Sequence, residues 1–286
     1  STELHATVEP LGDVATGDDG SVWFTTERGV VRQAADGARA PYVVGAPIGS
    51  EHVARPITVD PQGRAWVTST DANAIARIGR DGPVTRFADG IPAGASLGTI
   101  DAGPDGSVWF AEPDVHQIGR ASPDGAIEQV TVGGAPEVVV ADLTGGVWFF
   151  DSDSSGFGHI DRSGVVARVA NATPSAPVVD MAVAPDSSIW YVADPGIVGR
   201  FGDALPLQEL PIPDSGGRTT GASFHHPKGI AADADGTIWF TDYFYGGEGS
   251  SISLYAVTTG AAPAAWPDDL PLDRPIGASL TTCGDR

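Results

Sequence analysis

Short runs of alternating apolar and polar residues, separated by Gly, Asp and Pro, make up most of the chain. The most regular run is centred on a tryptophan and recurs at intervals of roughly forty residues. The tryptophans that share this context are Trp23, Trp66, Trp109, Trp148, Trp190 and Trp239. An apolar anchor residue stands nine positions before each of them: Val14, Ile57, Ile100, Val139, Met181 and Ile230. Alternation of this kind predicts half-buried strands rather than helices.

A turn signal separates each anchor from its tryptophan. In four copies an Asp stands four positions before the tryptophan: Asp19, Asp105, Asp186 and Asp235. An Asp-Gly step between two such runs favours a hairpin, because Gly tolerates the positive φ that these turns require. Further strand-like runs follow, as in residues 75–82 and 117–125. Four short strands per repeat predict an all-β fold, a β-propeller of four-stranded blades.

The repeats predict a single domain over residues 1–286. Residues 11–266 hold six repeats, so six blades are preferred. Residues 1–10 are interpreted as a strand that completes the last blade and closes the ring. Residues 267–286 are a tail or a partial blade, and seven blades, with one split between the termini, remain the alternative.

Composition and charge exclude several classes of function. The net charge of −21 repels phosphate backbones, so we expect no nucleic-acid partner. No apolar run is long enough to predict a membrane span. Cys283 is the only cysteine, which excludes an internal disulfide. We expect a monomer. Because the sequence begins at Ser1 as if a leader had been removed, we also expect an extracytoplasmic or secreted location, with a cytoplasmic location as the alternative.

The repeat resembles that of the virginiamycin B lyase family. The segments that carry the resemblance are 229–242, 98–112 and 117–129. Propellers with NHL repeats and gluconolactonase-like propellers share parts of the pattern. The resemblance implies a propeller enzyme that opens streptogramin depsipeptide rings by elimination with the help of Mg²⁺. Members of that family have seven blades.

The family places a His two residues before the anchor and a Glu twelve residues after it. The first position is occupied here by Gly12, Arg55, Gly98, Glu137, Val179 and Lys228, none of them His. The second position is occupied by Thr26, Ser69, Glu112, Asp151, Ala193 and Asp242. A hairpin would bring both positions to one mouth of the channel. We therefore expect Glu112, Asp151 and Asp242 to bind Mg²⁺ or Ca²⁺ there, and Arg55 and Glu137 to contact a substrate.

The last repeat carries the strongest candidates for proton transfer. His225 and His226 precede Pro227 and Lys228, which is the only lysine of the chain. His226 or Lys228 is the expected base, together with Asp242, because imidazole and a buried amine can titrate near neutrality. We expect His225, Tyr243 and Tyr245 to shape a ligand site beside them.

These residues favour a lyase-like propeller enzyme. It would act at the channel mouth on a small or peptide-like natural product, by metal-assisted proton abstraction and elimination. Two other interpretations stay open, because propellers serve as binding proteins and as enzymes. One is a non-catalytic scaffold that binds a ligand or a protein. The other is a gluconolactonase-like, metal-dependent hydrolase.

Overall fold

The computed structural model describes residues 11–26, 29–44, 56–69, 73–170, 172–202, 205–212, 224–246 and 249–258. The chain divides into two compact parts, residues 1–147 with 161–165 and residues 148–160 with 166–286. The expected closing strand, Arg55, the tail from 267 onward and Cys283 lie outside the described residues.

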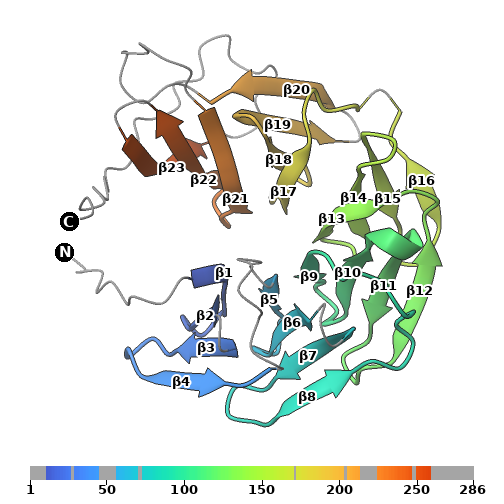
Figure 1. Cartoon of the computed structure of the whole chain (residues 1–286), viewed down its shortest axis with the longest axis vertical. Helices are drawn as coiled ribbons and strands as arrows, with labels where there is room; N and C mark the ends of the chain where they lie inside the picture. Colours follow the sequence, from blue (N-terminus) through green and yellow to red (C-terminus); the bar gives the residue numbers. More distant parts are fainter. Residues whose placement is uncertain are drawn as a thin grey trace. The chain divides into compact units, whose positions relative to one another are not determined.

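The described strands pair into six sheets, each a blade of a β-propeller fold (Figure 1). Blade 1 consists of β1 (Leu11–Thr16), β2 (Val22–Thr26), β3 (Gly29–Gln33) and β4 (Arg39–Tyr42). Blade 2 consists of β5 (Ile57–Val59), β6 (Ala65–Ser69), β7 (Ala74–Ile78) and β8 (Val84–Phe87). Blade 3 consists of β9 (Ile100–Ala102), β10 (Val108–Glu112), β11 (Gln117–Ala121) and β12 (Ile127–Thr131), with the short 3-10 turn η2 (Pro113–Val115) after β10.

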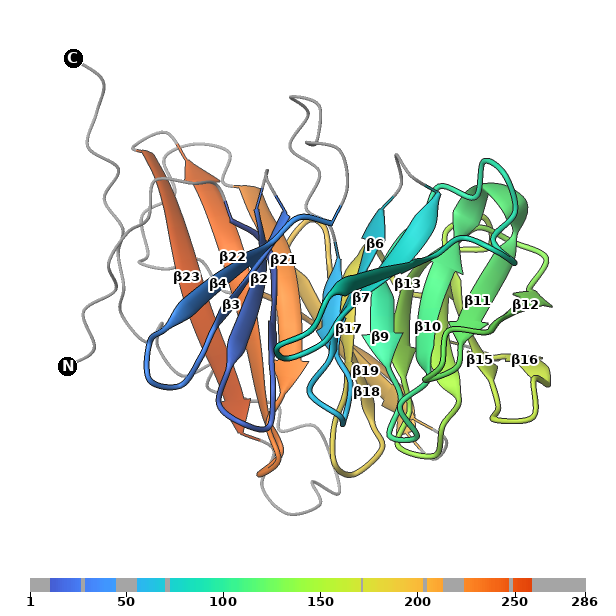
Figure 2. The same ribbon diagram turned by 90° about the horizontal axis from the view of Figure 1, so that it is seen from below.

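The other three blades repeat this order. Blade 4 consists of β13 (Pro136–Ala141), β14 (Val147–Asp151), β15 (Gly156–Ile160) and β16 (Val166–Arg168). Blade 5 consists of β17 (Val178–Val183), β18 (Ile189–Ala193), β19 (Ile197–Gly202) and β20 (Leu205–Pro211). Blade 6 shows three long strands, β21 (Phe224–Ala232), β22 (Thr237–Gly246) and β23 (Gly249–Thr258) (Figure 2). The predicted all-β propeller with six blades is confirmed.

The first strands of neighbouring blades lie side by side within each part of the chain. In the first part β1, β5, β9 and β13 follow one another, and in the second part β17 lies next to β21 (Figure 1). Half-buried carboxylates connect some of these strands. The N–H of Ile57 donates to Asp13 Oδ2 at 3.0 Å, and the N–H of Ile230 donates to Asp180 Oδ2 at 3.0 Å. Such bonds fix the position of blade 2 on blade 1 and of blade 6 on blade 5.

In blades 2, 3 and 5 the tryptophan and the residue after it are both buried in the core. Trp109 is buried beneath the guanidinium of Arg120, which lies 5.0 Å from its ring centroid. Phe110 lies over Gly119 of the neighbouring strand, where a Cβ would come within 2.2 Å of the phenyl ring. Gly is therefore required in β11 by close packing. None of the described residues form a helix long and apolar enough to cross a membrane.

Candidate functional site

The hairpin of β21 and β22 brings His225 to Asp242. Pro227 pairs with Asp242, so His225, two residues earlier on β21, points to the same face as Asp242. The His225 Nδ1 lies 2.5 Å from Asp242 Oδ2. Asp242 is fully buried, and the His225 side chain is 11% exposed. This contact forms a His–Asp pair that reaches the surface only through the imidazole.

The pair has the geometry of an oriented general base. A carboxylate beside Nδ1 holds the proton on that nitrogen and makes Nε2 the basic one. The other oxygen of Asp242, Oδ1, is buried and has no hydrogen-bond partner among the described residues. The contact of Oδ2 with Nδ1 places Asp242 to stabilise the imidazolium that forms when Nε2 accepts a proton.

A turn of blade 5 contacts both histidines. Asp194 follows β18, and its carboxylate oxygens lie 3.0 and 3.2 Å from His226 Nδ1. Gly196 lies two residues on with a φ of 65°, and a Cβ there would come within 2.7 Å of the His225 Cβ. Glycine is required at this position by both the φ and the close approach. The turn at 194–196 thus places the histidines at the junction of blades 5 and 6.

Lys228 lies at an irregularity of β21. The pairing register shifts between Pro227 and Gly229, which makes Lys228 the extra residue of a bulge. Its side chain is exposed. Tyr243 is half-buried and pairs directly with His226, whereas the side chain of Tyr245 lies outside the described residues. His225 and Asp242 therefore lie on one face of this hairpin, and His226 and Tyr243 lie on the other.

Glu112 lies in blade 3 and contacts the outermost strand of that blade. Gln129 Nε2 donates to its Oε1 at 3.1 Å. Glu112 is fully buried, and this burial raises its pKa to about 7, although the hydrogen bond from Gln129 acts in the opposite direction. Its Oε2 and the Oε1 atoms of Gln117 and Gln129 are buried without a hydrogen-bond partner among the described residues. A group of acceptors without donors favours the protonated form of Glu112.

Asp151 lies at the end of β14 and is held by a cation. Arg168 Nη1 lies 2.6 Å from its Oδ2, and the Ser154 hydroxyl donates to the same oxygen at 2.8 Å. Burial acts to raise the pKa of Asp151, but Ser154 and Arg168 outweigh it and hold the pKa below its usual value. Glu137 is exposed on β13. Its carboxylate is positioned for contact with solvent.

The expected metal ligands do not provide the coordination that a hard cation needs. Mg²⁺ and Ca²⁺ require several converging oxygen ligands. Glu112 bonds to Gln129, Asp151 to Arg168 and Asp242 to His225. Nowhere in the described ranges do three or more His, Cys, Asp or Glu side chains gather. Within each part of the chain, these residues do not form a site for a metal ion. A cation held jointly by residues of both parts, at one mouth of the channel, stays a prediction.

The comparison with family models decides the affiliation of the chain. The model of the virginiamycin B lyase family matches residues 4–249. The chain belongs to this family. The match covers blades 1 to 5 and strands β21 and β22 of blade 6, which carry the His225–Asp242 pair. No curated protein matches the chain.

Solved structures similar to this family member share its fold. The virginiamycin B lyase from Staphylococcus aureus is 23% identical, with a TM-score of 0.68 over 87% of this chain and 85% of that chain. A catalytically inactive histidine-to-alanine variant of that enzyme with quinupristin is 21% identical, with a TM-score of 0.68 over 89% and 94%. A gluconolactonase from Xanthomonas campestris is 17% identical, with a TM-score of 0.58 over 86% of each chain.

Three of the candidate residues have partners that were not expected from the sequence: Asp194, Gln129 and Arg168. Asp194 is followed by Pro195 and Gly196, a combination that indicates a turn. Nothing in that signal tells which histidine the turn meets, because the contact depends on how blade 5 packs against blade 6. Gln129 and Arg168 belong to the outermost strands of their blades. The alternation of apolar and polar residues is weak there, so the sequence does not indicate which side chains these two residues contact.

Proposed function

We propose that the chain is a lyase-like propeller enzyme in which His225, oriented by Asp242, is the general base. The observation that carries this proposal is the 2.5 Å contact between His225 Nδ1 and Asp242 Oδ2, with Asp242 fully buried. An imidazole held in this way is suited to remove a proton from a substrate. The role expected for His226 or Lys228 thus moves to the neighbouring histidine.

The proposed substrate is a small or peptide-like natural product with an ester. It carries an acidic C–H next to a carbonyl group and an ester oxygen on the following carbon. His225 Nε2 takes the proton, the C–H electron pair becomes a C=C bond, and the C–O bond breaks. The ester oxygen leaves as a carboxylate, and the imidazolium later releases its proton to water. Asp242 stabilises the imidazolium during this step.

Lys228 binds the substrate in this proposal. It supplies the positive charge that a leaving carboxylate requires. His226 and Tyr243 pair with each other on the opposite face of the hairpin from His225 and Asp242, so neither lies beside the base. None of these steps requires a metal ion.

The known relatives support a reaction that depends on histidine. The family of this chain is named for a lyase. In the enzyme from Staphylococcus aureus, replacement of one histidine by alanine gives a catalytically inactive protein. Similarity below 25% identity carries over the fold alone, so the proposal rests on the His225–Asp242 geometry of this chain.

The mass of the product tests the reaction class. We expect the purified chain to open quinupristin or a simpler cyclic depsipeptide without any change in mass, because elimination only rearranges atoms. The measurement is liquid chromatography with mass detection, together with the ultraviolet absorption of the new C=C bond. Hydrolysis would add one water and would support a gluconolactonase-like hydrolase instead. An intact ring after prolonged incubation with a panel of depsipeptides and lactones would contradict the enzyme and favour a binding scaffold.

A further inference from the structure

Blade 3 carries three side-chain oxygens that are buried without a donor. They are Oε2 of Glu112 and the Oε1 atoms of Gln117 and Gln129, all closed to solvent, and they accept no hydrogen bond from the described residues. Buried acceptors of this kind are uncommon in folded proteins, because an unpaired buried polar atom has lost its bonds to water and gained nothing in return. Three of them in one blade indicate a guest that contacts oxygen.

The pairing register places the three side chains on one face of the blade. Glu112, at the end of β10, pairs directly with Gln117, the first residue of β11. Gln117 in turn pairs with Thr131 of β12, and Gln129 stands two residues before Thr131 on the same face. The Gln129 amide reaches the carboxylate, since its Nε2 donates to Glu112 Oε1 at 3.1 Å and to the Gly90 carbonyl at 2.8 Å. The three side chains therefore form one group, the blade 3 oxygen cluster.

The chemistry of this cluster favours a small monovalent cation. A proton on Glu112 could be donated to only one of the two amide oxygens and would leave the other unpaired. A cation can contact all three oxygens at once. One ionised carboxylate balances a single positive charge, whereas a divalent ion would leave an uncompensated charge in a buried place. Mg²⁺ and Ca²⁺ also need more oxygen ligands than the three of this cluster.

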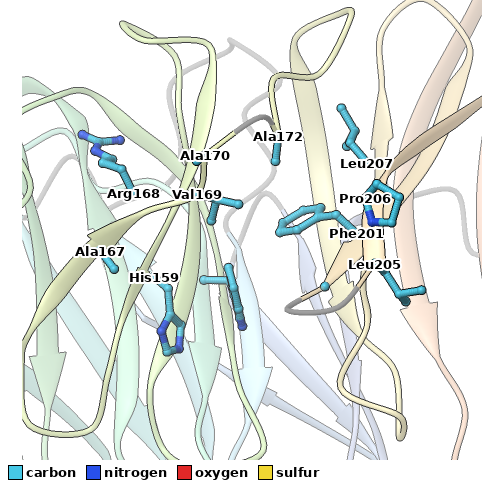
Figure 3. A pocket seen from close by; sticks show the side chains of 12 residues that line it. His159, Ala167, Arg168, Val169, Ala170, Ala172, Phe201, Leu205, Pro206 and Leu207 are labelled. Atoms are coloured by element: carbon cyan, nitrogen blue, oxygen red, sulfur yellow. The ribbon is translucent and has the colours of Figure 1, made fainter.

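The size of the guest is limited by the burial of the cluster. Because the three oxygens are closed to solvent, a guest that contacts them is no larger than a water molecule. The pocket lined by Phe201, Leu205 and Pro206 in the other part of the chain is different (Figure 3). Its volume of about 580 Å³ is in the range of sites for small organic molecules. The blade 3 oxygen cluster has room for a bare ion at most, which favours sodium over larger cations.

We propose that Glu112, Gln117 and Gln129 bind a sodium ion or another monovalent cation of that size. The ion neutralises the buried carboxylate and joins the strands β10, β11 and β12. This site differs from the expected Mg²⁺ or Ca²⁺ site, which combined carboxylates of three blades, because its other ligands are amide oxygens of the same blade. It takes no part in the proposed elimination and stands whether or not the chain is an enzyme.

Thermal unfolding at pH 8 tests the cation. Glu112 has a pKa of about 7, so its carboxyl group is mostly ionised at this pH. NaCl replaces tetramethylammonium chloride, whose cation is too large for the cluster, at constant ionic strength, so that screening of the net charge of −21 stays the same. We expect the melting temperature to rise by about 3 °C per tenfold increase in Na⁺ once the site is half filled. Equal melting temperatures in both salts, or a larger rise with MgCl₂, would overturn the proposal.

Two variants separate this site from general effects of salt. Glu112→Gln removes the charge that balances the ion and should make the melting temperature independent of Na⁺, so any advantage of this variant at pH 8 should shrink as Na⁺ is added. Gln117→Met keeps the length of the side chain without its oxygen and should move the response to at least tenfold higher Na⁺ concentrations. Asp151→Asn, in blade 4, is the matched control and should respond like the wild type. An equal response in Glu112→Gln and the wild type would place the ion elsewhere and overturn the proposal.

Discussion

His225→Asn is expected to lower kcat/KM for ring opening by about a thousandfold, within the range usually lost with a general base. The asparagine amide can still donate to Asp242, so the buried carboxylate keeps a hydrogen-bond partner. Asparagine has no basic nitrogen, however, and cannot accept the substrate proton. Steady-state kinetics with a depsipeptide that the wild type opens provide the measurement.

Two controls distinguish the loss of chemistry from the loss of structure. The melting temperature of His225→Asn should change little, because the contact with Asp242 and the packing over Gly196 are largely kept. His226→Asn should reduce turnover much less, since its partner Asp194 and its own ring are both well exposed. Full activity in His225→Asn, combined with inactivity in His226→Asn, would show that His226 is the base and would contradict the proposal.

Glu112→Gln is expected to stabilise the protein at alkaline pH. The pKa of Glu112 is raised from 4.5 to about 7 by burial. Between these values the folded chain holds a proton that the unfolded chain has lost, so stability falls as the pH rises from about 4.5 to 7. Above pH 7 the loss is complete and amounts to on the order of 3 kcal/mol. A neutral glutamine avoids this penalty and can donate to a neighbouring amide oxygen.

The difference in unfolding free energy between Glu112→Gln and the wild type reports this group alone. We expect a gain that is near zero at pH 4.5, grows towards pH 7 and stays constant above it, measured by urea unfolding. Asp151→Asn is the matched control, because Ser154 and Arg168 hold the pKa of Asp151 below its usual value. That variant should lose stability at neutral pH, and the loss should shrink as the pH falls. A constant difference across the pH range would show that Glu112 does not titrate near neutrality.

The blades could be predicted from the sequence because each is specified by local signals. The expected Asp-Gly turns are present, with φ values of 74° at Gly20, 81° at Gly106 and 86° at Gly236. Period-two alternation and turn chemistry act over a few residues and need no knowledge of distant contacts. The same signals could not place the second partner of a contact between blades, such as Asp194 with His226.

The candidate site was predicted only in part. His225, His226 and Asp242 were all singled out by their position in the last repeat. Which histidine faces Asp242 depends on the pairing register, since a shift of one residue moves every side chain to the other face. The bulge at Lys228 sets that register here. A bulge is a response to packing as well as to sequence, so the exchange of roles between His225 and His226 could not be foreseen.

A double-mutant cycle of kcat/KM with His225→Asn and Asp242→Asn is the most direct test of the proposed base. If the two residues act as one unit, the double variant should be about as slow as His225→Asn alone, because Asp242 works only through the imidazole. The single Asp242→Asn should lose much of the activity as well. Losses that multiply in the double variant, or an Asp242→Asn enzyme that keeps full activity, would contradict a His225–Asp242 base.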